Sequence, residues 1–198
     1  AMNSTPNKGL AILGGTFDPV HLGHLFLAQD AIETLRLERV VFVPAARNPL
    51  KINRPEATDA QRLEMLQLAL CSDCRFLLDD LEIRAGGSSY SIDTVEMLHS
   101  RYPEVKLYWL IGSDELQQLP KWRRIDELLK LVDFVSFPRP GYPRQVPSLN
   151  NLRIHEIQGH VFDVSASEIR GRVKQGLQVS LFLPPKVCHY IEFHGLYR

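Results

Sequence analysis

The sequence has few cysteines, no excess of charge of either sign and no long hydrophobic run. Its three cysteines, Cys71, Cys74 and Cys188, are too few for a disulfide framework, so we expect a reducing compartment. No second Cys pair or nearby His completes a zinc site with Cys71 and Cys74, and we interpret all three cysteines as structural. No apolar stretch approaches the roughly 20 residues that span a bilayer, and no signal-peptide pattern opens the chain. We therefore expect a cytoplasmic protein without a membrane partner.

Charge and length set further bounds on the class of protein. The 23 basic and 23 acidic side chains cancel, so no overall field attracts a nucleic acid or a membrane, and anion binding must rest on local clusters. A chain of 198 residues fits one domain and is long enough to bury a core. We expect residues 1–8 to be a cloning remnant and flexible tail, and residues 9–198 to form the domain. The sequence leaves open whether the chain forms a homo-oligomer.

Short apolar runs alternate with amphipathic stretches along the chain. The runs at 10–13, 40–43, 75–78, 107–111, 134–137 and 154–157 are typical of buried strands. Between them, helical spacing predicts helices from Leu22 to about Leu37, from Thr58 through Leu70, over 92–99, around 115–119 and 128–129, and later from Ser165 and from Pro185. This alternation implies right-handed crossovers. The predicted fold class is α/β, a single domain with a doubly wound parallel sheet of Rossmann-like type.

Two acidic stretches have a structural and a functional interpretation. Asp79, Asp80 and Glu82 have the residue types of a metal site, but their alternation with Leu81 and Ile83 favours an exposed strand edge. Asp114, after the strand-end turn at Gly112, has the residue type either to hold a ribose hydroxyl or to cap the helix that follows. On sequence alone, the helix cap is the favoured role of Asp114.

One turn carries the clearest chemical signal. Residues 14–24 read Gly-Gly-Thr-Phe-Asp-Pro-Val-His-Leu-Gly-His and lie between the first strand and the first helix. Glycines allow the backbone to approach an anion closely, and the free N–H groups of the helix start favour negative charge. His21 and His24 are three residues apart, which places their rings on one helix face. Two imidazolium groups there would donate to the phosphoryl oxygens of a nucleotide.

The same His-x-x-His spacing has a metal-binding alternative. Zinc binds such pairs, but no Cys or carboxylate nearby has an obvious ligand spacing, and the glycines would then have no role. We therefore favour phosphate binding over zinc at His21 and His24, and we assign no metal ligand in the chain. A second outward-facing helix start lies at residues 164–170, where Ser165 and Glu168 have capping-box spacing and Arg170 follows one turn later.

Taken together, these motifs resemble the nucleotidyltransferase superfamily, and within it the bacterial nicotinate-mononucleotide adenylyltransferases. The similarity rests on the 14–24 turn, Ser-Tyr-Ser-Ile-Asp-Thr at 89–94, Gly-Ser-Asp-Glu-Leu at 112–116 with Trp122 downstream, Arg-Pro-Gly-Tyr at 139–142, and residues 164–170. These motifs span nearly the whole chain. The resemblance implies transfer of an adenylyl group from ATP to nicotinate mononucleotide, which gives deamido-NAD and pyrophosphate in NAD biosynthesis.

The resemblance also implies roles for individual residues. His21, His24 and Arg170 would be catalytic, and Mg²⁺ would be bound through the ATP phosphates. Nicotinate mononucleotide would contact Ser91, Trp122 and Arg123, with Trp122 stacked on the pyridine ring and backbone amides near Ser91 and Arg123 receiving the carboxylate. The residues implied in ATP binding are Gly14, Gly15, Thr16, Phe17, His21, His24, Gly112, Asp114, Ser167, Ile169 and Arg170.

Two departures from the family pattern matter. Val-Ser-Ala-Ser at 164–167 replaces a common Ile-Ser-Ser-Thr, which leaves open which hydroxyl reaches the ATP phosphates. Pro-Leu-Lys at 49–51 replaces the common Pro-Pro-His, so the role of Lys51 as ligand of the substrate phosphate is our own inference. The alternatives are a sister adenylyltransferase for nicotinamide mononucleotide or phosphopantetheine, and a nucleotide-binding regulator without turnover. His21 counts against the pantetheine enzymes, which generally carry Thr there. His21, His24 and Arg170 together count against a regulator.

Overall fold

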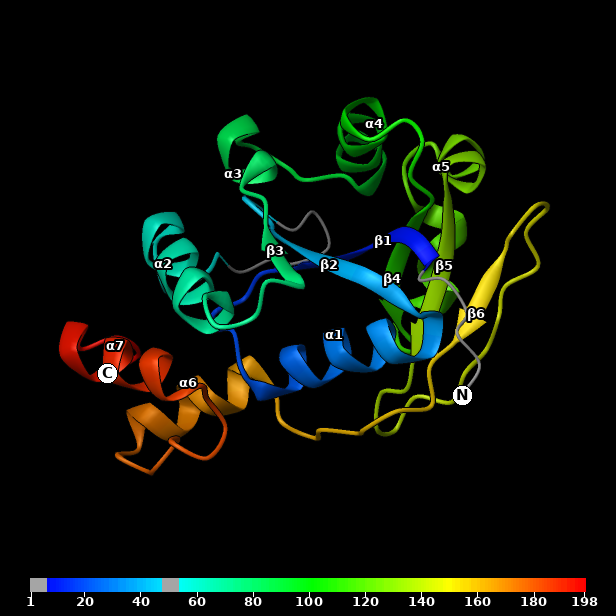
Figure 1. The fold of residues 1–198 in the computed structure, drawn as a ribbon. Helices are drawn as coiled ribbons and strands as arrows, with labels where there is room; N and C mark the ends of the chain where they lie inside the picture. The colour runs from blue at the N-terminus through cyan, green and yellow to red at the C-terminus, as the bar shows by residue number, and fades with distance from the viewer. Residues whose placement is uncertain (1–6, 48–53) are drawn as a thin grey trace, which may run out of the picture.

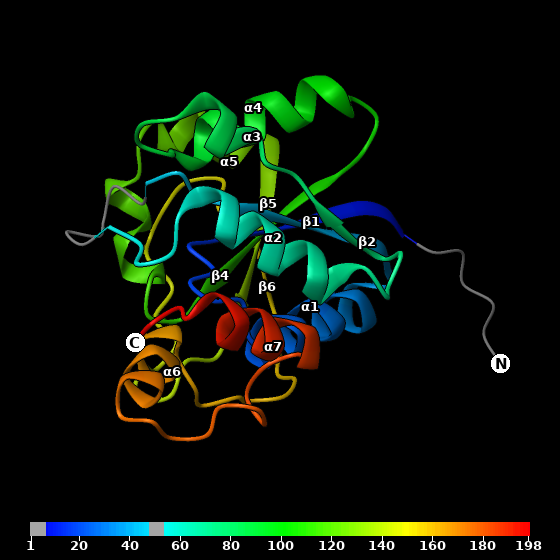
Figure 2. The ribbon, with the colours of Figure 1, turned by 90° about the vertical axis from the view of Figure 1, so that its left-hand side faces the viewer.

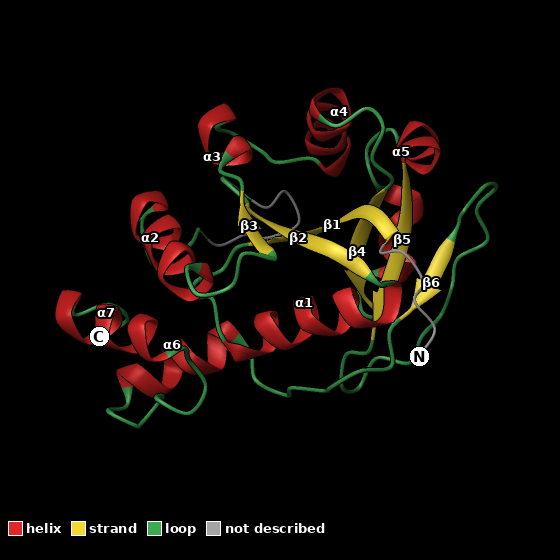
Figure 3. Ribbon diagram, viewed as in Figure 1, coloured by secondary structure: helices red, strands yellow, loops and turns green. Residues whose placement is uncertain are grey.

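A single parallel sheet forms the centre of the computed structural model, which describes residues 7–47 and 54–198. Within these residues its six strands run in the order β3-β2-β1-β4-β5-β6, and all neighbouring strands are parallel (Figures 1 and 3). The strands are β1 (Asn7–Gly15), β2 (Leu37–Pro44), β3 (Phe76–Leu78), β4 (Leu107–Gly112), β5 (Val132–Phe137) and β6 (Ile154–Glu156). The chain order reverses between β1 and β4, where open α/β sheets bind their ligands.

Helices cover both faces of the sheet, so the prediction of a doubly wound fold is confirmed. The core on one face includes buried residues of α1 (Leu22–Leu35), α2 (Asp59–Leu70), α6 (Ala166–Lys174) and α7 (Pro185–His194). The core on the other face includes buried residues of α3 (Leu81–Ala85), α4 (Ser91–Arg101), η1 (Leu116–Lys121, a 3₁₀ helix) and α5 (Ile125–Leu131). In Figure 2, α3, α4 and α5 lie above the sheet and α1, α6 and α7 below it.

The two cores follow from the alternation of side chains along each strand. On β1, Ala11 and Leu13 belong to one core, whereas Leu10 and Ile12 belong to the other. All four side chains are buried, which explains why the strand is a continuous apolar run rather than an alternating pattern. The same pattern made the central strand β4 recognisable in the sequence.

Some predicted boundaries differ from the structure. α1 ends at Leu35, two residues before the predicted end at about Leu37, and Leu37 is the first residue of β2. The helix ends because Arg36 adopts a left-handed conformation with φ 55°, a position that glycine usually marks in a sequence. β1 begins at Asn7, which pairs with Leu37, although the sequence predicts the tail to continue to Lys8.

The expected strand edge after β3 is a short helix instead. α3 begins at Leu81, whose N–H donates to the Asp79 carboxylate at 3.0 Å, so the prediction of an exposed edge is wrong. Glu82 is buried, and its carboxylate accepts a hydrogen bond from the Thr94 hydroxyl on α4. Burial raises the pKa of Glu82 above its ordinary value. Two acidic residues therefore organise the packing of α3 against β3 and α4.

The three cysteines differ in their exposure. Cys188 is buried and free, whereas Cys71 and Cys74 are free and exposed, so a role in core packing fits Cys188 alone. Among the described residues, none of the helices has both the length and the apolar character that crossing a membrane requires.

Candidate active site

A cleft of about 770 Å³ lies at the carboxyl edge of the sheet, where β1 and β4 end. The residues that line it come from the 14–24 turn, the start of α4, the turn after β4, the Trp122 loop and the start of α6. Most of the residues that the sequence singled out line this cleft: Gly14, Gly15, Thr16, Phe17, His21, His24, Ser91, Gly112, Asp114, Trp122, Arg123, Ser167 and Arg170. Lys51 lies outside the described residues. Ile169 is on α6, but its side chain is fully buried in the core.

The two histidines form the capping box of α1. His21 is the N-cap, and its Nδ1 accepts from the Gly23 N–H at 3.1 Å, while the His24 Nδ1 accepts from the His21 N–H at 3.1 Å. The rings are stacked with their centroids 3.9 Å apart. A nitrogen that accepts from a backbone N–H carries no proton, so the proton of each neutral ring is on Nε2. Each neutral ring therefore carries its N–H at Nε2.

His21 is neutral rather than positively charged. Burial, with a smaller contribution from the charge of Arg139, lowers the pKa of His21 to about 4. Burial disfavours the charged form and Nδ1 is needed as an acceptor, so the structure favours a neutral His21 ring over the expected imidazolium. A neutral ring still offers its Nε2–H to a phosphoryl oxygen.

Gly23 and Phe17 shape the space around the histidines. A Cβ on Gly23 would lie 2.8 Å from ring atoms of both His21 and Phe162, so only glycine fits between them. Phe17 adopts a positive φ of 50° and is buried, and its ring meets His24 edge-on with a centroid distance of 4.8 Å. Gly23, the glycine of the His-x-Gly-His motif, thus leaves room for the packed rings. The sequence predicted only that the glycines let the backbone approach a phosphate.

Arg62 binds the backbone of the 14–24 turn, a role that the sequence did not predict. This fully buried side chain on α2 donates from Nη1 to the carbonyls of Thr16 at 2.7 Å and Ala45 at 2.8 Å, and it pairs with Asp59 at 2.6 Å. It therefore ties the end of β2 to the phosphate turn. Arg62 comes four residues after the predicted helix start at Thr58, and nothing in the sequence pattern distinguishes it from a solvated arginine.

Asp18 joins three distant segments at the same turn. Its carboxylate accepts from the N–H groups of Glu56 at 2.7 Å and Ala57 at 3.1 Å, and from the Tyr197 hydroxyl at 2.6 Å. Its carbonyl accepts from the Arg170 Nη1 at 2.8 Å. Asp18 thus holds three segments around the cleft: the residues before α2, the end of the chain, and α6. These contacts explain why the motif contains an acidic residue.

The start of α6 brings Arg170 and Ser167 into the cleft. Ser165 is the N-cap and accepts from the Glu168 N–H at 3.1 Å, as the spacing predicts. Ser167 accepts from the Arg170 Nη2 at 3.2 Å, and Arg170 also pairs with Glu56 at 3.3 Å. The Ser165 hydroxyl is engaged in capping, so Ser167 is the better placed of the two serines to reach a phosphate.

Asp114 faces the cleft instead of capping a helix. The N-cap of η1 is Glu115, whose side chain makes no capping hydrogen bond, and the Asp114 carboxylate lies 3.8 Å from the Arg139 Nε, so the prediction of a cap by Asp114 is wrong. A Cβ on Gly112 would lie 2.3 Å from the Asp114 carboxylate, which explains the glycine. Ser113 accepts from the Arg139 N–H at 2.9 Å and holds that residue beside the turn.

The other end of the cleft is built by Trp122 and the start of α4. The half-buried Trp122 ring packs edge-to-face on Trp109 and Phe134, with centroid distances of 6.1 and 6.0 Å, while it also lines the cleft. The N-cap of α4 is Tyr90, and its own side chain makes no hydrogen bond to the first N–H groups of the helix. The guanidinium of Arg123 lies 4.7 Å from the centre of the Tyr90 ring. This end therefore offers an aromatic surface beside an anion-binding helix start.

Among the described residues, His21 and His24 have no third ligand that would complete a zinc site. In the part of the chain that the structure describes, no group of three or more His, Cys, Asp or Glu side chains is arranged to hold a metal ion. His21 and His24 also use their Nδ1 atoms within the helix cap. The arrangement fits an anion bound by N–H donors better than a metal bound by the imidazoles.

Comparison with known proteins agrees with this geometry. The family model of cytidylyltransferase-like proteins matches residues 12–172. A relative from Opitutus terrae, named "Probable nicotinate-nucleotide adenylyltransferase", is 45% identical over 190 residues, which cover 96% of this chain and 97% of the relative. The chain belongs to the nicotinate-nucleotide adenylyltransferase family. Another protein of that name, from Methylacidiphilum infernorum, is 38% identical over 196 residues, which cover 99% of this chain and 95% of that protein.

The nicotinate-nucleotide adenylyltransferase family also matches in fold. The structure of the Plasmodium falciparum nicotinic acid mononucleotide adenylyltransferase complexed with NaAD superposes with a TM-score of 0.78 over 96% of this chain and 98% of that protein. The sequence identity to it is 19%, so this likeness concerns the fold. The family resemblance expected from the motifs is confirmed.

Proposed function

We propose that this protein transfers the adenylyl group of ATP to the 5′-phosphate of nicotinate mononucleotide, which yields deamido-NAD and pyrophosphate for NAD biosynthesis. The observation that carries the proposal is the stacked His21–His24 pair, whose Nδ1 atoms both accept backbone N–H bonds, in a cleft that also holds Arg170. Membership of the nicotinate-nucleotide adenylyltransferase family supports the choice of substrates.

The triphosphate of ATP lies across the histidines and the start of α6 in this proposal. The Nε2–H groups of His21 and His24 donate to phosphoryl oxygens, and Arg170 and Ser167 hold the phosphates that leave. Gly14 and Gly15 let the backbone approach the nucleotide, and the start of α1 adds its positive dipole. Gly112 and Asp114 lie on the adenosine side, and Ile169 would contribute through its backbone alone, because its side chain is in the core.

The reaction is a direct in-line displacement. An oxygen of the mononucleotide 5′-phosphate forms a bond to the α-phosphorus of ATP, the bond from that phosphorus to the β-phosphate oxygen breaks, and pyrophosphate leaves. The cleft supplies N–H donors and a guanidinium but no activated protein nucleophile, so catalysis rests on positioning and charge. Mg²⁺, held by the phosphate oxygens, would neutralise charge on them, and this needs no cluster of protein ligands.

The acceptor end lies at Trp122 and α4. The pyridine ring stacks on the exposed part of Trp122, and its carboxylate accepts from the free N–H groups at Ser91 and near Arg123. Lys51, which lies outside the described residues, remains our candidate ligand for the mononucleotide phosphate. A carboxylate has acceptor oxygens only, whereas a carboxamide would turn its NH₂ toward one of these donors. This difference favours nicotinate over nicotinamide mononucleotide.

Product identification tests the proposal. The purified protein is incubated with Mg²⁺, ATP and each acceptor in turn, namely nicotinate mononucleotide, nicotinamide mononucleotide and phosphopantetheine, and products are identified by mass spectrometry. Deamido-NAD and pyrophosphate in equal amounts are expected from the first acceptor. Absence of turnover with all three would favour a nucleotide-binding regulator. Adenylylated protein after incubation with ATP alone would contradict direct transfer.

A further inference from the structure

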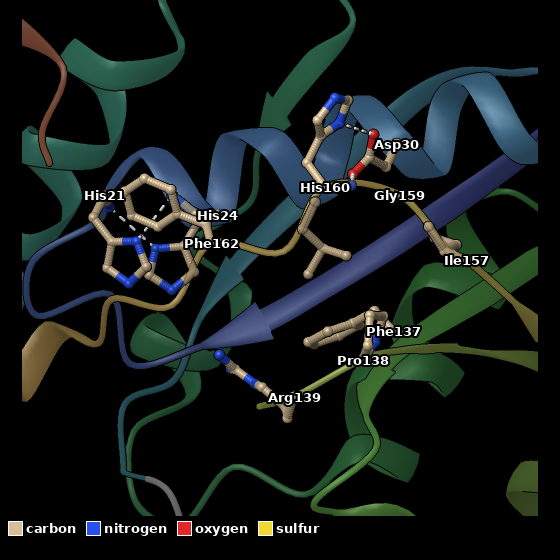
Figure 4. A pocket seen from close by; sticks show the side chains of 12 residues that line it. His21, His24, Asp30, Phe137, Pro138, Arg139, Ile157, Gly159, His160 and Phe162 are labelled. Atoms are coloured by element: carbon tan, nitrogen blue, oxygen red, sulfur yellow. Dashed lines mark hydrogen bonds and ion pairs between the residues drawn. The ribbon is translucent and has the colours of Figure 1, made fainter. Parts of the chain in front are cut away.

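Asp30 is a buried carboxylate in the middle of α1, outside the motif turn. It accepts two hydrogen bonds from His160, one from the backbone N–H at 2.7 Å and one from the ring Nδ1 at 2.9 Å. The Asp30 side chain is 6% exposed, whereas the His160 side chain is 77% exposed. The two residues are 130 positions apart in the chain, so this contact fixes the segment after β6 onto α1 (Figure 4).

The contact holds residues 159–162, which we call the strap, tightly against the helix. A Cβ on Gly159 would lie 2.2 Å from the Asp30 carboxylate, so glycine is needed for this approach. Phe162, at the other end of the strap, lies edge-on to Phe26 with a centroid distance of 5.4 Å and nearly parallel to the His21 ring at 6.0 Å. Figure 4 shows the Phe162 ring beside the two histidines and His160 turned toward Asp30.

We propose that Asp30 and His160 are a positioning pair for His21, because their contact holds the strap on α1 and so keeps the Phe162 ring over the His21 ring, away from water. The strap also forms one wall of a recess of about 40 Å³ that opens beside His21, His24 and Arg139. Without the contact, the strap would lose its anchor on α1, and the His21 ring would gain water and freedom to rotate. The catalytic consequence rests on the proposed function, whereas the shielding of His21 does not.

The charges around this region define the pH behaviour. Hydrogen bonding to Asp30 and its negative charge raise the pKa of His160, and Glu33 on the next turn of α1 adds to this. On the other side, Arg139 disfavours a charge on His21, and the neighbouring ring is that of His24. The backbone bond from His160 to Asp30 does not titrate, and a neutral His160 with its proton on Nδ1 keeps the second bond. The strap is therefore anchored across neutral pH.

The test is an NMR titration of the histidine rings in the full-length protein labelled with ¹⁵N-histidine. The unmodified His21 is expected to titrate at about pH 4. In Asp30→Ala and Phe162→Leu, the pKa of His21 rises toward its ordinary value of 6.5. In His160→Ala the pKa of His21 rises less, because the backbone bond to Asp30 remains. Glu33→Gln is the matched control, since it removes an exposed carboxylate from the same helix without a hydrogen bond to the strap, and it leaves His21 unchanged.

Kinetics of the same variants complete the test. The kcat of Asp30→Ala falls about two- to tenfold, the effect of one hydrogen bond on orientation, while the KM for nicotinate mononucleotide stays within about twofold. An unchanged titration of His21 in folded Asp30→Ala and Phe162→Leu overturns the proposal. If Asp30→Ala does not fold, an unchanged His21 in both Phe162→Leu and His160→Ala does the same. Because the titration needs no substrate, its result stands apart from any failure to form deamido-NAD.

Discussion

The rings of His21 and His24 are stacked with their centroids 3.9 Å apart, and the same two side chains close the N-terminus of α1 through their Nδ1 atoms. One pair of residues thus caps a helix and presents two Nε2–H donors to the cleft. Replacement of either residue by alanine removes a cap and a donor together. Variants that keep the cap are therefore needed to measure the contribution of each donor.

His24→Asn is such a variant. The asparagine Oδ1 can replace Nδ1 as the acceptor of the His21 N–H, while the Nε2–H donor is lost. We expect kcat to fall by roughly 10²–10³, the usual cost of one transition-state donor, with unchanged thermal stability. His189→Ala, which removes an exposed histidine on α7, is the control with full activity. Near-normal turnover of His24→Asn would falsify the assignment of His24 as a phosphate donor.

The low pKa of His21 predicts a pH dependence of stability. Between about pH 4 and 6.5 the unfolded chain binds a proton at this residue that the folded protein does not, so stability is present above this window and is lost as the pH falls through it. The full effect is about 3 kcal/mol. Urea unfolding across this range should show a steeper slope with pH for the unmodified protein than for His21→Asn, in which asparagine serves as the N-cap. Parallel slopes would show that His21 titrates normally.

Arg170 should act on ATP and not on the acceptor. A charged hydrogen bond contributes about 1.5–3 kcal/mol, so Arg170→Ala should weaken ATP binding or transition-state stabilisation roughly ten- to a hundredfold. Arg172→Ala removes an equal charge from the same helix, where Arg172 bonds to the Gln178 carbonyl, and should change neither. Calorimetric titration with each substrate separates the effects. Loss of mononucleotide binding with ATP binding intact would mean that the two half-sites are exchanged.

Trp122 should affect both mononucleotides alike. Stacking contributes about 1–3 kcal/mol per ring and does not distinguish an acid from an amide. Trp122 also packs on Trp109 and Phe134, so Trp122→Leu keeps more of the core than alanine would. We expect kcat/KM to fall for nicotinate and nicotinamide mononucleotides while their ratio is largely kept. A variant that loses the ratio but keeps its turnover would assign carboxylate recognition to the indole.

The parallel sheet, the two-sided core and most of the cleft could be predicted because they follow from short-range patterns. Parallel strands buried on both faces are continuous apolar runs, and the glycine turns follow β1 and β4 directly. Capping residues such as Thr58 and Ser165 also have local signatures: Thr58 forms its predicted capping box, and Ser165 accepts the predicted bond from the Glu168 N–H. The local signal failed at Arg36, where a residue other than glycine ends a helix in the left-handed conformation.

The contacts that could not be predicted join residues far apart in the chain. Asp18 with Tyr197, Arg62 with Thr16, and Asp30 with His160 are separated by 179, 46 and 130 positions. Arg62 and Asp30 have ordinary sequence neighbourhoods, and although Asp18 lies within the 14–24 motif, nothing in that motif indicates its contact with Tyr197. The neutral state of His21 is similar, because it depends on Arg139 and on burial that only the folded chain creates.

Selectivity between the two pyridine mononucleotides is the most direct test of the account. The measurement is kcat/KM of the unmodified protein for nicotinate and for nicotinamide mononucleotide, determined side by side by pyrophosphate release at saturating ATP and Mg²⁺. Sites that read a group by complete hydrogen-bond pairing reject the wrong group by about 10²–10⁵, and we expect a preference for nicotinate of at least the lower value. Comparable kcat/KM values for the two substrates would contradict carboxylate recognition at the start of α4 and would favour an adenylyltransferase of broader specificity.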